Sequence, residues 1–142
     1  NIKGNDVAND IWGLDGADQL NGGAGDDQLY GGAGADKLVG GDGNDLLIGG
    51  TGNDKAYGEA GADTFVFAKG DTFLDVFDFD HAGEGDILKL SGLDGVTDYA
   101  SLTASGALTE GNGRVILTFA DERIFLRDVT LAEVSSDMFD FV

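Results

Sequence analysis

The sequence predicts an all-β fold in which short parallel strands stack into a solenoid, followed by a second β-rich region. The main observation is a repeat, because the chain from Gly13 to Val66 divides without a gap into nine-residue units. In order they are GLDGADQLN, GGAGDDQLY, GGAGADKLV, GGDGNDLLI, GGTGNDKAY and GEAGADTFV. A degenerate unit, GNDVANDIW, precedes them from Gly4. The period then ends, which predicts a repeat region over residues 1–66 and a C-terminal β-rich cap over residues 67–142.

Each unit has two halves with different physical demands. The first six places are rich in glycine and small polar residues, which suits tight turns with positive φ and close backbone approach. The last three places carry one regularly spaced apolar residue, which predicts a very short strand whose middle side chain points inward. These predicted core residues are Ile11, Leu20, Leu29, Leu38, Leu47, Ala56 and Phe65.

The units must stack, because nine residues of turn and strand cannot bury their apolar side chain alone. Two successive units close one coil of about eighteen residues, so that units two apart in the sequence become neighbours in two parallel sheets. The sixth place of each unit then lines one of two edges of the solenoid. One edge carries Asn9, Asp27, Asp45 and Asp63, and the other carries Asp18, Asp36 and Asp54.

The aligned carboxylates predict bound metal ions. Neighbouring strands lie roughly 4.8 Å apart, and carboxylates at this spacing repel each other strongly unless a cation lies between them. The sequence has no cysteine and one histidine, so the ligands are Asp oxygens and turn carbonyls, which select a hard cation. Calcium fits better than magnesium because it accepts about six to eight oxygens in irregular geometry. A merely solubilising acidic surface, the alternative, does not need in-register spacing.

The composition sets further limits. The formal net charge is −19, and self-repulsion together with the backbone entropy of glycine opposes collapse of the repeats. We therefore expect the repeat region to be largely unfolded without calcium and to fold as calcium binds. The sequence contains no apolar run of membrane-spanning length and no visible signal peptide, and the start at Asn1 looks cut from a longer protein. We expect no nucleic-acid partner for so acidic a chain.

Units such as GGAGDDQLY and GGDGNDLLI match the pattern G-G-x-G-x-D-x-U-x at every fixed place, where U is a large apolar residue. The chain therefore resembles the RTX family of calcium-binding nonapeptide repeats, whose pattern this is. The resemblance implies a right-handed parallel β-roll with ions between turns two units apart. Each ion is then bound by the sixth-place aspartates of both units and by backbone carbonyls of the turns.

Carried over to this sequence, the resemblance implies about four to five calcium ions, the fifth being a weaker site at Asn9 and Asp27. The full sites pair Asp18 with Asp36, Asp27 with Asp45, Asp36 with Asp54 and Asp45 with Asp63. The turn residues implied as further ligands, mainly through their carbonyls, are Gly16, Gly23, Gly25, Gly31, Gly32, Ala33, Gly34, Gly40, Gly41, Asp42, Gly43, Gly49, Thr51, Gly58 and Ala60.

The C-terminal region has the pattern of a β-rich cap. TFVFAKG, TFLDVFDFD and GDILKLSGL predict short strands, and RVILTF and RIFLRDV predict a hairpin around residues 120–122. Thr130 and Glu133 have the spacing of a capping box, which predicts a short helix from Thr130. Solenoids need caps because an open last coil exposes unpaired strand edges. We expect this region to extend or cover the end of the roll.

Acidic residues also gather outside the sixth place. Asp78, Asp80 and Asp86 predict one more cation site at the join between repeats and cap, with a simple acidic turn as the alternative. His81 lies in the same stretch, where a lone histidine is more often hydrogen-bonded than a ligand or a base. Asp26, in the fifth place of its unit, is interpreted as a turn residue that raises the local negative potential.

Strand alternation also predicts the two outer faces of the roll. One is too apolar to lie in water without a reason, and we expect the second half of the chain to cover it, with a partner protein or an upstream domain as the alternatives. This face carries Asp10, Trp12, Gln28, Tyr30, Leu46, Ile48, Thr64 and Val66. The opposite face carries Gln19, Asn21, Lys37, Val39, Lys55 and Tyr57.

The chain ends in DMFDFV, from Asp137 to Val142. An acidic residue followed by apolar ones resembles the terminal signature of RTX proteins exported by type I secretion, including serralysin-type proteases and mannuronan epimerases. The stretch from ADTFVFAKGD to GDILKLSGL is similar to the segment after the roll in those proteins. The resemblance implies an extracellular module that is recognised by a type I secretion apparatus. A last strand within the cap is the alternative, and the two are compatible.

The sequence leaves three candidate functions to compare. The first is a calcium-binding module that folds outside the cell, supports secretion and stabilises an upstream domain. The second is a polysaccharide-binding module, since Lys37, Lys55 and Tyr57 share one face, although these lysines also serve as ordinary surface charges that offset nearby Asp residues. An enzyme is the third, and the sequence has no HExxH pair, no GxSxG elbow and no cysteine to support catalysis. We expect a non-catalytic module.

Overall fold

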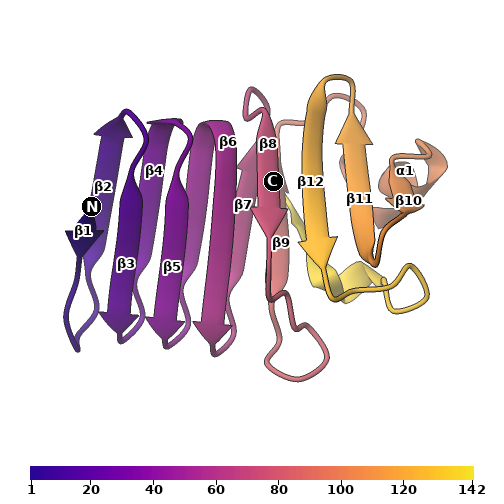
Figure 1. The fold of residues 1–142 in the computed structure, drawn as a ribbon. Helices are drawn as coiled ribbons and strands as arrows, with labels where there is room; N and C mark the ends of the chain where they lie inside the picture. The colour runs from indigo at the N-terminus through magenta and orange to yellow at the C-terminus, as the bar shows by residue number, and fades with distance from the viewer.

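A computed structural model describes residues 1–142 and shows a parallel β-solenoid that further strands extend at its C-terminal end (Figure 1). The chain winds alternately through two facing sheets, here called sheet A and sheet B. Sheet A contains β1 (Ile2–Lys3), β3 (Gln19–Ala24), β5 (Lys37–Asp42) and the second half of β6 (Leu46–Ala60). Sheet B contains β2 (Asp10–Asp15), β4 (Gln28–Gly34), the first half of β6 and β7 (Thr64–Ala68).

The strand register confirms the predicted coil of two units. In sheet B, Gln28 lies opposite Leu46 in a parallel pair, and in sheet A, Gln19 lies opposite Lys37 in the same way. Both pairs join residues two units apart. Strand β6 runs continuously through its turn and pairs in both sheets, so the coils have no separate loops at this point.

The predicted core residues all point into the space between the sheets. None of the seven is more than 6% exposed, and burying one leucine side chain stabilises a fold by about 1.5 to 3 kcal/mol. Ala56 is the smallest of them and stacks between Leu38 and Val76. The same cluster continues into the cap through Leu88 and Leu126. Roll and cap therefore share one core.

The cap lengthens both sheets along the solenoid axis. Strand β8 (Phe73–Val76) joins β6 to β12 (Glu122–Arg127), which pairs with β11 (Arg114–Phe119), and β10 (Leu108–Glu110) follows β11. In sheet B, β9 (Ile87–Ser91) pairs with β7 and with β13 (Phe139–Phe141). The predicted hairpin of β11 and β12 is confirmed. Parallel pairing continues past Val66 into β8 and β9.

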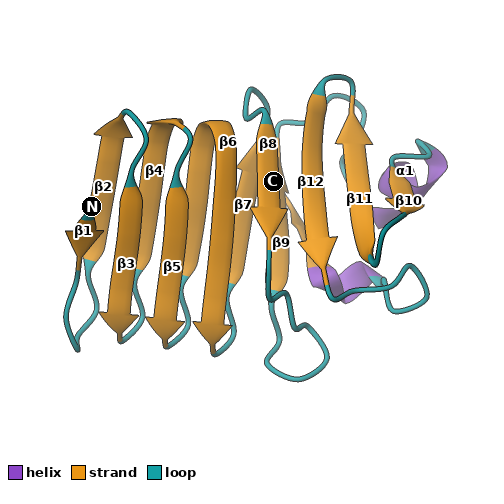
Figure 2. Ribbon diagram, in the orientation of Figure 1, coloured by secondary structure: helices purple, strands orange, loops and turns teal.

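The helices are confined to the cap (Figure 2). Helix α1 (Tyr99–Ala104) was not predicted, and it begins at Asp98, whose side chain accepts the Ser101 N–H at 2.7 Å. The predicted helix from Thr130 is wrong. The Glu133 carboxylate does accept the Thr130 N–H, which is one of the two capping-box bonds, but only a turn follows, because the chain soon extends at Ser135 before the 3₁₀ helix η1 (Ser136–Met138) and strand β13. No helix is long and apolar enough to span a membrane.

The apolar side chains on the outer face of sheet B range from half-buried, as for Leu46, Ile48 and Val66, to exposed, and the prediction that the second half of the chain covers this face is wrong. Trp12 is 52% exposed and stacks on Tyr30, with 5.3 Å between the ring centroids. The reason is the direction of growth, because β9 and β13 continue sheet B beyond the last coil, at the end opposite the N-terminus, and do not fold back over the roll (Figure 1).

Candidate metal centre

The sixth-place residues form two side-chain ladders along the edges of the solenoid. We call Asn9, Asp27, Asp45 and Asp63 the first edge, and Asp18, Asp36 and Asp54 the second edge. The carboxylate Oδ1 of each internal aspartate accepts the backbone N–H of the sixth-place residue one coil earlier. Asp45 accepts from Asp27 at 2.7 Å, and Asp54 accepts from Asp36 at 2.9 Å. Sixth-place residues of units two apart in the sequence therefore lie along the same edge of the solenoid, as the period predicts.

The second carboxylate oxygens are buried and lack donors. Asp27, Asp36, Asp45 and Asp63 are at most 2% exposed, and their Oδ2 atoms have no hydrogen-bond partner. A buried ionised oxygen without a partner is strongly unfavourable, and proteins pair such groups or bind metals with them. This arrangement fits a hard cation that takes oxygen ligands.

The first-place glycines leave the space in which these oxygens lie. A Cβ atom on Gly22 would overlap Asp27 Oδ2 and would lie 2.8 Å from the carbonyl oxygen of Gly40 in the next coil. Gly22 and Gly40 do not have positive φ, so glycine is required here for close approach rather than for a left-handed conformation. Carboxylate and carbonyl oxygens of successive coils therefore meet above each first-place glycine.

Glycines in the second and fourth places have a different role. Gly23 and Gly25 have φ values of 115° and 100°, a region that other residues rarely adopt. Their carbonyl oxygens lie against Gly41 and Gly43 of the next coil, where a Cβ atom would clash. The carbonyls predicted as ligands thus face the gap between coils. Glu59 takes a second place with φ of 70°, a strain of about 1 to 2 kcal/mol.

The third-place carbonyls are already engaged in the fold. Ala33 accepts the Gly16 N–H at 2.7 Å, Asp42 accepts the Gly25 N–H at 2.7 Å, and Ala60 accepts in the same way. A carbonyl oxygen has two lone pairs. Each of these predicted ligands therefore retains one lone pair for a cation.

Asp78 and Asp86 act as end caps of the roll. The Asp78 carboxylate accepts the Gly58 N–H at 2.9 Å, and Asp86 accepts the N–H groups of Asp63 at 2.9 Å and Asp80 at 2.8 Å. Asp86 therefore takes the next position on the first edge, although it lies outside the repeat. No group of three or more acidic, histidine or cysteine side chains converges to hold a metal, so the extra cation site stays a prediction.

His81 has a polar partner at each ring nitrogen. Nδ1 lies 2.7 Å from the Asp86 carbonyl oxygen, and Nε2 lies 3.3 Å from Asp137. The bond to the Asp86 carbonyl raises the pKa of His81, and Asp137 adds to this effect. The side chain ties the loop after the roll to the C-terminal segment.

Sequence reasoning missed a second ladder, formed by fifth-place residues of the first edge. The Asn44 N–H donates to Asp26 Oδ1 at 2.8 Å, and the Ala62 N–H donates to Asn44 Oδ1 at 2.8 Å. These bonds run in the opposite direction to those of the sixth place. Asp26 is thus a specific acceptor as well as a local charge, and its spacing of two units from Asn44 was the available signal.

Burial raises the pKa of the ladder aspartates. It raises the pKa of Asp63 to about 7 and the pKa values of Asp45 and Asp54 to about 6, against partial relief from the backbone N–H donors. The folded roll therefore holds protons that the unfolded chain releases. Without calcium, we expect stability to fall as pH rises from about 4 through 7. Circular dichroism in chelator between pH 4.5 and 8 checks this, and a β signal that grows with pH contradicts it.

The predicted polysaccharide residues lie together on the outer face of sheet A. Lys37 and Lys55 are register neighbours, and Lys37 Nζ lies 4.7 Å from the centre of the Tyr57 ring. Tyr57 in turn stacks on Phe77, with 4.5 Å between the ring centroids. The Arg127 guanidinium lies over the Phe77 ring, 4.1 Å from its centroid. This row of cations and aromatic rings crosses from the roll into the cap.

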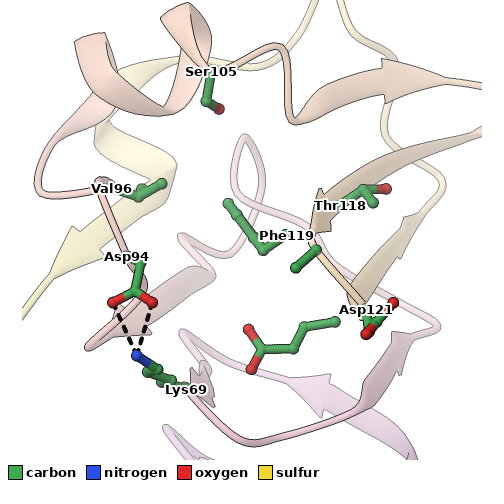
Figure 3. A pocket seen from close by; sticks show the side chains of 9 residues that line it. Lys69, Asp94, Val96, Ser105, Thr118, Phe119 and Asp121 are labelled. Carbon is green, nitrogen blue, oxygen red and sulfur yellow. Dashed lines mark hydrogen bonds and ion pairs between the residues drawn. The ribbon is translucent and has the colours of Figure 1, made fainter.

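A cavity of about 460 Å³ lies in the cap, away from the ladders (Figure 3). Val96 and Phe119 provide apolar lining, and Asp121 lies at the hairpin tip on one side. The Lys69 ammonium bridges both oxygens of Asp94 at 2.8 and 2.9 Å. This ion pair is exposed, and the cavity contains none of the predicted ligands.

The fold has known structural relatives. The extracellular lipase LipA from Serratia marcescens superposes with a TM-score of 0.57 at 16% identity, covering 98% of this chain and 39% of the lipase. The AlgE6R3 subunit of the Azotobacter vinelandii mannuronan C5-epimerase superposes with a TM-score of 0.51 at 28% identity, covering 96% of this chain and 79% of the subunit. This chain thus spans well under half of the lipase. No curated protein sequence is significantly similar to it.

The family comparison agrees with the geometry of the turns. The model of the RTX calcium-binding nonapeptide repeat (4 copies) matches residues 3–38 and 39–74, which is half of the chain. The matched residues contain both aspartate ladders and the glycines beside them. The chain belongs to the RTX calcium-binding nonapeptide repeat family.

Proposed function

We propose that this module folds when calcium binds outside the cell, and that its folding supports type I secretion and stabilises an upstream domain. The observation that carries the proposal is the set of buried Oδ2 atoms without donors on Asp27, Asp36, Asp45 and Asp63. A bound cation or a proton relieves these oxygens, so the stability of the folded state depends on what the surrounding solution supplies.

The ligands are proposed from the same geometry. On the first edge, Asp27 and Asp45 hold one ion together with carbonyls of Gly23 and Gly25, which face the gap between coils. The second edge repeats this set one unit later in the sequence, from Asp36 and Asp54 with Gly32 and Gly34. Asp18 with Asp36 and Asp45 with Asp63 form the remaining full sites.

Calcium concentration makes folding directional. Extracellular calcium modules bind at about 0.1 to 1 mM, far above cytosolic calcium, so the chain stays extended inside the cell and can pass through a channel. Outside, ion binding folds the coils and opposes backward movement. The terminal strand β13 pairs with β9 in the folded cap, which is compatible with a signal that is read only before folding.

Export of a fusion protein tests the proposal. A reporter placed before Asn1 is expected to reach the medium through a type I apparatus, and to be recovered active in millimolar calcium. Asp27→Asn combined with Asp45→Asn lowers this yield several-fold, because the paired ligands are lost. Asp121→Asn, at the exposed hairpin tip, is the matched control. Equal yields from both variants, with or without calcium, contradict the proposal.

A second candidate function is binding of an acidic polysaccharide on sheet A. Besides Lys3 near its N-terminal end, the outer face of this sheet carries five of the eight lysine and arginine residues of this acidic chain, together with the rings of Tyr57 and Phe77. Cations and aromatic rings together suit a sugar polymer that carries carboxylates. They are Lys37, Lys55, Arg114, Arg123 and Arg127.

Alginate binding by the calcium-loaded module tests this candidate. We expect Lys37→Ala with Lys55→Ala to weaken binding about tenfold, while Lys69→Ala, on the cap and outside the row, leaves it unchanged. A neutral glycan of equal length is the control for charge. Alginate affinity that does not respond to the double substitution contradicts the assignment.

A further inference from the structure

We infer that the two edges of the roll are unequal calcium sites: the first edge binds calcium more tightly and fills first, and Asn44 is a positioning residue for it. This inference rests on the proposed ligands and adds an order to them. Two independent differences between the edges carry it, one in hydrogen bonding and one in charge.

The first difference is that the first edge is held by two ladders and the second edge by one. On the first edge, the Asp45 carboxylate accepts from the coil before it, while Asn44 bonds to Asp26 in that coil and to Ala62 in the next. On the second edge, the equivalent of Asn44 is Asn53, whose side chain forms no hydrogen bond. The turns of the first edge are therefore held by more hydrogen bonds in the folded state, so a larger share of the ordering that accompanies calcium binding is offset there than on the second edge.

The end of the ladder adds to this difference. Asp86 accepts the Asp63 N–H in the same way as the repeat aspartates do, so the first edge is closed at its last coil. On the second edge, Asp54 has no such successor, because β6 pairs there with β8 and Asp54 lies opposite Leu74. The pair of Asp45 and Asp63 is thus hydrogen-bonded to Asp27 in the coil before it and to Asp86 after it.

The second difference is electrostatic. A hollow of about 470 Å³ on the first edge is lined by three acidic residues and one lysine, and a hollow of about 340 Å³ on the second edge by two acidic residues and two lysines. Asp26 also adds its charge beside Asp27 and Asp45. Calcium affinity rises with the negative charge of a site, so both differences favour the first edge. The charged lining residues are Lys3, Asp6, Asp42 and Glu59 on the first edge, and Asp18, Asp36, Lys37 and Lys55 on the second.

Calcium titration calorimetry of the whole chain tests the order. We expect two classes of sites that differ about tenfold in affinity. Asp45→Asn, at the centre of the first edge, removes the tight class, whereas Asp36→Asn, at the centre of the second edge, removes the weak class. Loss of the tight class in Asp36→Asn, or a single class in the wild type, overturns the inference. Absence of any calcium heat in the wild type contradicts the proposed function itself.

Two surface variants keep the test valid when the aspartate variants fail to fold. Lys37→Gln with Lys55→Gln is expected to tighten the weak class about fivefold and to leave the tight class unchanged. Asn44→Ala weakens the tight class about fivefold, and Asn53→Ala, the same substitution on the second edge, leaves both classes unchanged. Equal effects of the two asparagine substitutions, or no response to the lysine substitutions, overturn the inference.

Discussion

We expect chelation of calcium at neutral pH to unfold the repeat region, and millimolar calcium to restore it. At millimolar calcium and a Kd of about 0.1 mM, each site contributes about 1.4 kcal/mol, so about four sites contribute about 6 kcal/mol. This matches the whole stability of an ordinary domain, about 5 to 15 kcal/mol. Without the ions, the buried aspartates and a net charge of −19 oppose folding.

Far-ultraviolet circular dichroism checks this result, with loss of the β signal in chelator and its return in calcium. Trp12, the single tryptophan, lies in the first coil and stacks on Tyr30, so its fluorescence reports whether unfolding reaches that end. Magnesium at the same concentration is the control, because it prefers strict octahedral geometry and retains water. A β spectrum that chelator leaves unchanged contradicts calcium-linked folding.

We expect Gly40→Ala to destabilise the calcium-loaded module by about 3 kcal/mol and to weaken the Asp45 site. A Cβ atom here would overlap Asp45 Oδ2 and would lie 2.9 Å from the Gly58 carbonyl oxygen. The carbonyl belongs to a paired strand and cannot move aside, so the carboxylate must leave its position. Thermal unfolding in saturating calcium, together with calcium titration, measures both effects.

Gly111→Ala is the matched control for this substitution. Gly111 does not have positive φ, and a Cβ atom there would meet only Ile116 Cδ1, at 3.8 Å. The free energy of unfolding is expected to change by less than about 0.5 kcal/mol, since the unfolded chain also loses some freedom. Similar melting temperatures for the two variants contradict the role assigned to first-place glycines.

The repeat predicted much of the site because it is local and periodic. Two periods, nine residues along the chain and eighteen residues between stacked neighbours, predict the core position of each unit, such as Leu29. They also predict the edge on which each sixth-place aspartate lies. The same logic did not reach Asp86, which continues the first edge from a loop 23 residues after Asp63. An irregular loop has no period from which its end point can be inferred.

Hydrogen-bond direction was also beyond the pattern. Asp26 has the same residue type as Asp27, yet its carboxylate accepts from the later coil while the Asp27 carboxylate accepts from the earlier one. Only the stacked backbone decides which N–H each oxygen meets. The helix expected at Thr130 failed for a related reason, because its capping bond is local but the chain beyond must extend to pair β13 with β9.

The sequence by itself determined the solenoid, its coil length, its core and the oxygen-rich turns, because each of these is repeated locally in every unit. Tertiary structure alone decided where the cap lies, which end residues close the ladders and how the charges are shared between the two edges. These features depend on contacts between segments with no common period, such as Asp86 with Asp63 or Arg127 with Asp75. Packing of the whole chain, rather than any one unit, makes the two edges different.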